Sequence, residues 1–76
     1  MFFEVKEVID DKIGRTIVNG DNIAYINDLD DIDPERKGHP KLANSVIIYI
    51  SKEITLCKES LAELATFLYG EDRKKK

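Results

Sequence analysis

The fold of this chain is decided by residues 44–70, which read NSVIIYISKEITLCKESLAELATFLYG. Residues 45–50 are β-branched or aromatic at most positions, and such side chains fit a pleated strand better than a helix. Both faces of this strand are apolar, so we expect both to be covered. Residues 53–58 alternate between apolar and polar, with Ile54 and Leu56 on one face. The two runs therefore predict an antiparallel hairpin with a short polar turn.

The hairpin is followed by the signals of a helix start and a helix end. Ser60 and Glu63 form a capping box, because each side chain can hydrogen-bond the backbone amide of the other residue. Gly70 stands where helices commonly end. Between them runs one apolar stripe at helical spacing, made of Leu61, Leu64, Ala65 and Leu68. The stripe has to pack against an apolar surface, and the hairpin is the nearest one.

The first half of the chain predicts three more strands, at residues 2–9, 15–18 and 23–26. Residues 10–14 are expected to form a turn between the first two strands, in which Gly14 is free to take a positive φ. Residues 19–22 are either a tight hairpin turn or a bend leading into the next strand.

Two segments carry no regular pattern. Residues 27–44 are rich in Asp and contain both prolines, and a loop of this length in a small domain is often functional or mobile. Residues 71–76 are a charged tail that we expect to be disordered.

Residues 1–70 are then one α+β domain of order β-β-β-loop-β-β-α. Its fold is a five-stranded, mostly antiparallel sheet or open barrel with one C-terminal amphipathic helix.

Apolar side chains on both faces of several strands exceed what one short helix can cover. A large exposed apolar patch usually marks an interface, and a chain of 76 residues has a small core that oligomerisation can strengthen. We therefore expect a homo-oligomer. Its candidate interface consists of Phe2, Tyr25, Ile47 and Tyr49.

The composition limits the setting and the partners of the protein. A single cysteine excludes a disulfide within the chain and fits a reducing cytoplasm. No signal peptide is evident, and no apolar run reaches the roughly 18 residues of a membrane span, so we expect a cytoplasmic protein without a membrane partner. The net charge of −3 argues against general nucleic-acid binding. The charge is uneven, because residues 1–33 carry −6 and residues 34–76 carry +3.

The Asp-rich segment does not match a calcium loop. An EF-hand loop requires Gly at its sixth and Glu at its twelfth position, and counting from Asp31 these positions hold Arg36 and Leu42. His39 is the only histidine and has no Cys or His at the spacing of a metal site. The sequence also lacks an oriented nucleophile–base pair and a glycine-rich phosphate loop. We therefore expect no metal, no cofactor, no catalytic residue and no enzyme activity.

A short basic loop is the candidate for ligand or nucleic-acid contacts. It consists of Arg36, Lys37, His39 and Lys41, and residues 73–76 add a basic tail. Such groups can contact phosphates, although the loop lacks the interleaved aromatic residues of single-strand binders. Three functions stay open, in this order: a small regulatory module that binds itself and an unidentified protein; a nucleic-acid-binding regulator; and a protein that binds or sequesters a nucleotide-like ligand at a subunit interface.

Three segments of the chain resemble the small flagellar and swarming-motility proteins of the FlbD type. They are residues 18–28 (VNGDNIAYIND), 46–50 (VIIYI) and 58–64 (KESLAEL). The chain differs from that family in its long segment rich in Asp and Pro and in its Ser-Lys turn, where the family has a short loop and an Asn-Gly turn. A divergent phage-encoded relative would share these features. Residues 23–26 and 59–61 are also similar to parts of LytTR-type DNA-binding domains. The resemblance implies no catalytic residues.

Overall fold

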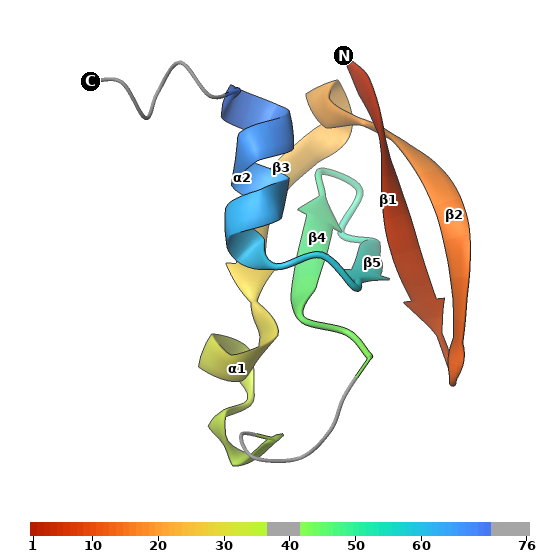
Figure 1. The fold of residues 1–76 in the computed structure, drawn as a ribbon. Coiled ribbons are helices and arrows are strands. Elements are labelled where there is room, and N and C mark those ends of the chain that lie inside the picture. The colour runs from red at the N-terminus through yellow and green to blue at the C-terminus, as the bar shows by residue number, and fades with distance from the viewer. Residues whose placement is uncertain (37–41, 71–76) are drawn as a thin grey trace.

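The computed structural model describes residues 1–36 and 42–70, which form one antiparallel sheet with a C-terminal helix (Figure 1). The strands are β1 (Phe2–Ile9), β2 (Lys12–Asn19), β3 (Ile23–Asp28), β4 (Ser45–Tyr49) and β5 (Ile54–Cys57). The helices are α1 (Leu29–Ile32) and α2 (Leu61–Tyr69), and two 3-10 turns are η1 (Gly20–Asn22) and η2 (Pro34–Arg36). The strand order is β2-β1-β5-β4-β3, and the sheet is open. The predicted α+β class, with five strands and a C-terminal helix, is confirmed.

The first hairpin is longer than the sequence predicted. β1 and β2 pair without a break over eight residues, from Phe2 opposite Asn19 to Ile9 opposite Lys12. The turn between them is made at Asp10, whose φ of 56° lies in the left-handed region that Asp tolerates better than most residues. The prediction that Gly14 forms part of the turn is therefore wrong, because Gly14 lies inside β2 opposite Glu7.

The connection between β2 and β3 is a bend, the second of the two alternatives. η1 is capped by Asn19, whose side chain accepts the Asp21 N–H at 3.0 Å. The Gly20 N–H donates to the Met1 carbonyl at 2.7 Å. A Cβ at Gly20 would lie 3.0 Å from the Met1 side chain and 3.4 Å from that of Leu68. The glycine thus permits a close approach, and the chain crosses from one edge of the sheet to the other instead of turning back on β2.

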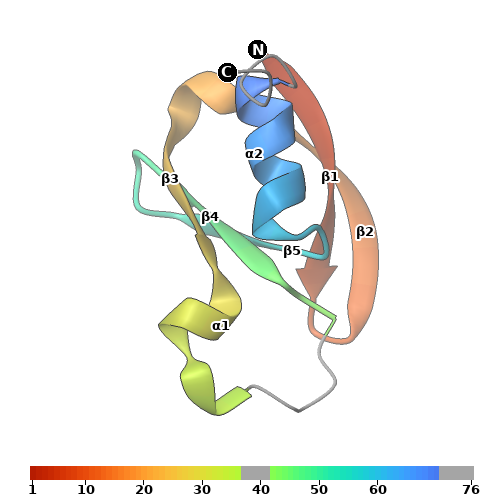
Figure 2. The same cartoon turned by 60° about the vertical axis from the view of Figure 1, so that its left-hand side comes forward.

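The second hairpin and the helix follow the prediction closely. β4 and β5 pair from Ser45 opposite Cys57 to Ile48 opposite Ile54. The capping box of α2 is present, with the Ser60 N–H donating to Glu63 Oε1 at 2.8 Å and the Glu63 N–H donating to Ser60 Oγ at 3.1 Å. Figure 2 shows α2 lying between β1 and β3, in front of β4 and β5.

The core lies between the sheet and α2. Its fully buried apolar residues come from four strands' inner face and from the helix, and they are Val5, Val18, Ile47, Cys57 and Leu64. Around them pack the partly buried side chains of Phe3, Ile23, Ile26 and Tyr49. Val46, on the opposite face of β4 from Ile47, is also buried. The prediction that both faces of this strand are covered is confirmed at these two positions.

The segment predicted as a long loop is only partly irregular. Residues 27 and 28 complete β3, and the Asp28 carboxylate accepts the Asp30 N–H at 2.7 Å, which caps the single turn of α1. The chain is tied back to the sheet where the Leu29 N–H donates to the Asn44 carbonyl at 3.1 Å. Residues 37–41 of this segment and the predicted disordered tail, residues 71–76, lie outside the described residues.

Candidate interaction surface

A row of apolar side chains crosses the face of the sheet that points away from the core. Ile54 on β5 lies opposite Ile48 on β4, and Ile48 lies opposite Tyr25 on β3. Ile54 is 57% exposed and Tyr25 is 55% exposed, while Ile48 between them is half-buried. We call Tyr25, Ile48 and Ile54 the outer row. Ile50, directly after β4, is also exposed.

The predicted oligomer interface falls on two different surfaces. Phe2 and Tyr25 are exposed, as an interface requires. Ile47 has no exposed surface and belongs to the core, so it is not available to a second subunit. Tyr49 packs against the core, and its hydroxyl lies 2.8 Å from Thr55 Oγ1.

The reason for this split is that alternation alone does not say which apolar face of β4 points inward. Ile47 shares its face with Ser45 and Thr55, which are polar but buried. Ser45 is accommodated because its hydroxyl donates to the Glu59 carbonyl at 2.7 Å. The apolar residues Ile48 and Ile54, which sequence reasoning did not select, are the ones left on the outer face. Their pairing across the hairpin was the signal that could have identified them.

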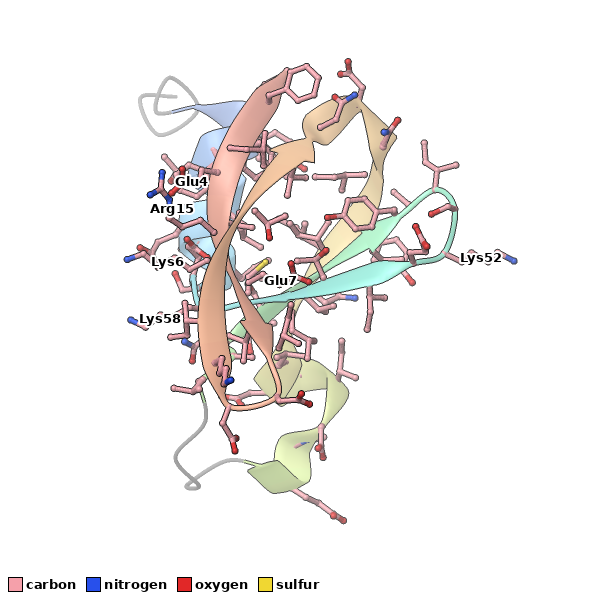
Figure 3. The ribbon with its side chains drawn as sticks, turned by 90° about the vertical axis from the view of Figure 1, so that its right-hand side faces the viewer. Glu4, Lys6, Glu7, Arg15, Lys52 and Lys58 are labelled. Atoms are coloured by element: carbon pink, nitrogen blue, oxygen red, sulfur yellow. The ribbon has the colours of Figure 1, made fainter. Side chains whose placement is uncertain are left out.

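The outer face of the first hairpin carries charged side chains beside the exposed apolar side chains of Phe2 and Ile17. Arg15 forms an ion pair with Glu4, with Nε 3.1 Å from Oε2. Lys6 lies directly opposite Arg15. Figure 3 shows these side chains extending to the same side of the molecule as Lys58, with Lys52 at the far end of the second hairpin. Among the described residues, the basic groups on this side thus alternate with Glu4 and do not form a continuous cationic surface.

A narrow seam joins the two hairpins. β1 and β5 share one paired position, Glu7 opposite Cys57, extended by the Lys58 N–H donating to the Lys6 carbonyl at 2.8 Å. The next donor on β1, the Lys6 N–H, is accepted by both carboxylate oxygens of Glu59, at 3.1 and 3.0 Å. A side-chain carboxylate thus takes the place of a strand carbonyl where β5 has already ended.

The single cysteine of the chain, Cys57, is buried in the core. Burial, together with the nearby charge of Glu59, raises the pKa of the Cys57 thiol to about 12. A thiol with that pKa is protonated at neutral pH and is a poor nucleophile. Within residues 1–36 and 42–70, no three His, Cys, Asp or Glu side chains are grouped so that they could hold a metal ion.

A shallow groove runs between η1, β3 and the end of α2. Its volume is about 240 Å³, and it is lined by Met1, Gly20, Asp21, residues 23–26, Leu68 and Tyr69. Ligand pockets commonly span roughly 300–1,000 Å³, so the groove is small for a nucleotide. The binding of a nucleotide-like ligand stays a prediction.

The predicted basic loop remains largely outside the structure. Arg36 is the last residue of η2, and Lys37, His39 and Lys41 lie outside the described residues. The nucleic-acid hypothesis, which depends on these residues and on the basic tail, stays a prediction.

None of the helices in the described part of the chain is long and apolar enough to cross a membrane. Comparisons of the chain with protein-family models, with curated proteins and with solved structures found no match.

Proposed function

We propose that this chain is a small, non-enzymatic, cytoplasmic regulatory module that acts as a homo-oligomer and binds a protein partner through the outer row. The observation that carries the proposal is the alignment of Tyr25, Ile48 and Ile54 across three neighbouring strands, with the two end residues more than half exposed. Scattered single apolar residues are normal on a protein surface, whereas a contiguous apolar patch usually marks an interaction site. The resemblance to FlbD-type proteins suggests one of two roles. The chain is either a motility protein or a divergent, phage-encoded relative of that family.

The chemistry of the outer row suits a protein partner better than a small solute. Its side chains stand on a sheet, which holds them in fixed positions, and burying apolar surface contributes about 25 cal/mol per Å². Tyr at one end combines a large apolar ring with a hydroxyl, and this residue type is enriched among the side chains that dominate binding energies. A flat row of this kind fits an apolar strand or helix face of a partner.

The test compares two substitutions of the same chemistry at equal exposure. Ile54→Lys places a charge in the outer row, whereas Ile32→Lys places it on α1, where Ile32 is 55% exposed. Wild-type and variant proteins are immobilised and used for affinity capture from a lysate of the native host at high salt, followed by mass spectrometry. We expect at least one protein to be retained by wild type and by Ile32→Lys and to be lost with Ile54→Lys. Equal capture by all three proteins would contradict the role of the outer row.

A further inference from the structure

The outer edge of β2 is a row of backbone hydrogen-bonding groups with which no other strand in residues 1–36 and 42–70 pairs. β2 pairs with β1 along its whole length, and it is the last strand of the sheet. Figure 1 shows it at the margin of the molecule, with β1 on one side and no described helix or strand on the other. The Gly20 N–H points to β1, since it donates to the Met1 carbonyl. Backbone groups alternate in direction along a strand, so those of Ile13, Arg15 and Ile17 point away from the sheet.

Lys12 and Arg15 place charge on this edge, but the other features that usually prevent strands from pairing with other chains are missing in the described residues. Such features are prolines, bulges, short length or a covering element. β2 has eight residues, no proline and an unbroken register with β1. Ile17 on it is 64% exposed. The opposite edge of the sheet differs, because β3 carries a bulge between Ile23 and Tyr25 and lies against α2.

We propose that two copies of this chain join edge to edge by antiparallel pairing of their β2 strands, with the two-fold axis passing through Thr16. The proposal rests on the homo-oligomeric function above and names the contact between the copies. Ile17 of one copy then lies opposite Arg15 of the second copy, and these residues exchange backbone hydrogen bonds in both directions. The outer row lies on other strands and stays free for the protein partner.

Charge favours this register over the one with the axis at Arg15. Arg15 lies opposite Lys6, and Ile17 lies opposite Glu4. With the axis at Thr16, the first hairpins of the two copies join into one four-stranded sheet. A row of side chains across this sheet contains, in order, Lys6 and Arg15 of one copy and then Ile17 and Glu4 of the other. Opposite charges therefore stand at its two ends. With the axis at Arg15, one row would contain two Arg15 and two Lys6 side chains, and directly opposed like charges destabilise a sheet.

The third register is disfavoured by its length. An axis at Ile17 limits the paired stretch to residues 15–19, since η1 begins at Gly20, whereas an axis at Thr16 pairs residues 13–19. The Thr16 register also brings the two Thr16 side chains face to face, and cross-strand threonine pairs are favourable. Each Thr16 hydroxyl is oriented by its hydrogen bond to Glu7 Oε1, at 2.7 Å.

A cysteine scan tests the register. Thr16→Cys, Arg15→Cys and Ile17→Cys are oxidised separately in dilute solution and examined on a non-reducing gel. Facing non-hydrogen-bonded positions of antiparallel strands come closest together, so we expect Thr16→Cys to give a crosslinked dimer. The other two variants should react far more slowly, and wild type should stay uncrosslinked because Cys57 is buried. Faster crosslinking of Arg15→Cys or Ile17→Cys would overturn the register.

Light scattering tests the edge itself and separates it from the proposed function. Wild type and Ile54→Lys should have the mass of a dimer at low and at high salt, whereas Ile17→Lys, which adds a cation to the shared row, should have half that mass. Circular dichroism checks that each variant is folded. A monomeric wild type, or a dimer that survives Ile17→Lys but not Ile54→Lys, would overturn edge pairing. The second result would instead make the outer row the contact between copies.

Discussion

Glu63 makes the stability of the first turn of α2 depend on pH. Its hydrogen bonds with the backbone and side chain of Ser60 lower the pKa of its carboxyl below the ordinary value of 4.5, and the charges of Lys58 and Lys6 lower it further. A carboxyl whose pKa is lower in the folded state adds stability above its unfolded pKa, and this contribution is lost as the pH falls through the folded value. The folded state, through the cap of the first turn of α2, should therefore lose stability in acid.

The substitution Glu63→Gln isolates this effect, because the amide oxygen can still accept the Ser60 N–H but does not titrate. We expect the free energy of unfolding of wild type to fall as the pH drops below 4.5, and that of Glu63→Gln to fall less over the same range. Urea denaturation at a series of pH values measures both, with the exposed Glu53→Gln as the matched control. An equal acid loss in wild type and Glu63→Gln would show that this carboxylate is not its source.

The capping box of α2 could be predicted from the sequence, whereas the buried position of the Ile47 side chain could not. Ser60 and Glu63 are three residues apart, so the hydrogen bonds between them depend on local geometry alone. The choice between Ile47 and Ile48 as the inward residue depends on where the helix and the other hairpin pack. Local patterns predict local contacts, and burial on a strand with two apolar faces is decided by residues far away in sequence.

The turn between strands β4 and β5 contains a residue with strained backbone geometry. Lys52 has a φ of 77°, a region in which residues with a Cβ are disfavoured by about 1–2 kcal/mol. Glycine at this position removes that conflict but costs about 0.5–1 kcal/mol in extra conformational freedom of the unfolded chain. We expect Lys52→Gly to raise the free energy of unfolding by a few tenths of a kcal/mol to about 1 kcal/mol, measured by urea denaturation.

A glycine at the first residue of a strand supplies the control for this prediction. Lys12→Gly lies at the start of β2, where glycine brings the entropic cost without relief of strain, and should lower stability by about 0.5–1 kcal/mol. If both substitutions destabilise the protein to the same degree, the left-handed backbone at Lys52 stores no strain.

Element boundaries were predicted well where side-chain chemistry marks them. The capping box and Gly70 bound α2 in the sequence as they do in the structure. The start of β2 was missed because Gly14 resembles a turn residue, yet the reversal is made by Asp10, and Gly14 simply continues the strand. α1 was missed because its single turn depends on the cap from Asp28, inside a segment whose run of acidic residues resembled a solvated loop.

For the whole molecule, the strand order could not be read from the chain. Consecutive strands usually lie side by side, and Asn19-Gly20 resembles a tight turn, but β2 and β3 stand at opposite edges of the sheet. Where the chain crosses between these edges, Gly20 lies close to Met1 and Leu68, and the spacing of residues in the sequence does not indicate these contacts. The position of β2 at an edge of the sheet follows from this order, so it too could not be predicted from the sequence.

The seam between the two hairpins can be tested at Glu59, whose carboxylate accepts the Lys6 N–H. Removing the carboxylate in Glu59→Ala leaves the Lys6 N–H without its acceptor, and an unsatisfied amide on the edge of β1 should open more readily to water. We expect hydrogen exchange of the Lys6 amide to rise by at least tenfold, while the amides paired between β4 and β5 change little. Two-dimensional NMR measures both sets at once. Unchanged protection at Lys6 would mean that Glu59 does not hold the seam together.

The same seam has a kinetic consequence. Each hairpin, and the helix start beside the second one, is built from contacts between near neighbours in the chain, whereas Lys6 and Glu59 are 53 positions apart. Closing a long loop costs entropy before the distant contacts can offset it, and proteins that depend on such contacts fold more slowly. The two hairpins should thus assemble early and independently, and the rate at which the chain reaches its native state should be set by the moment the seam closes.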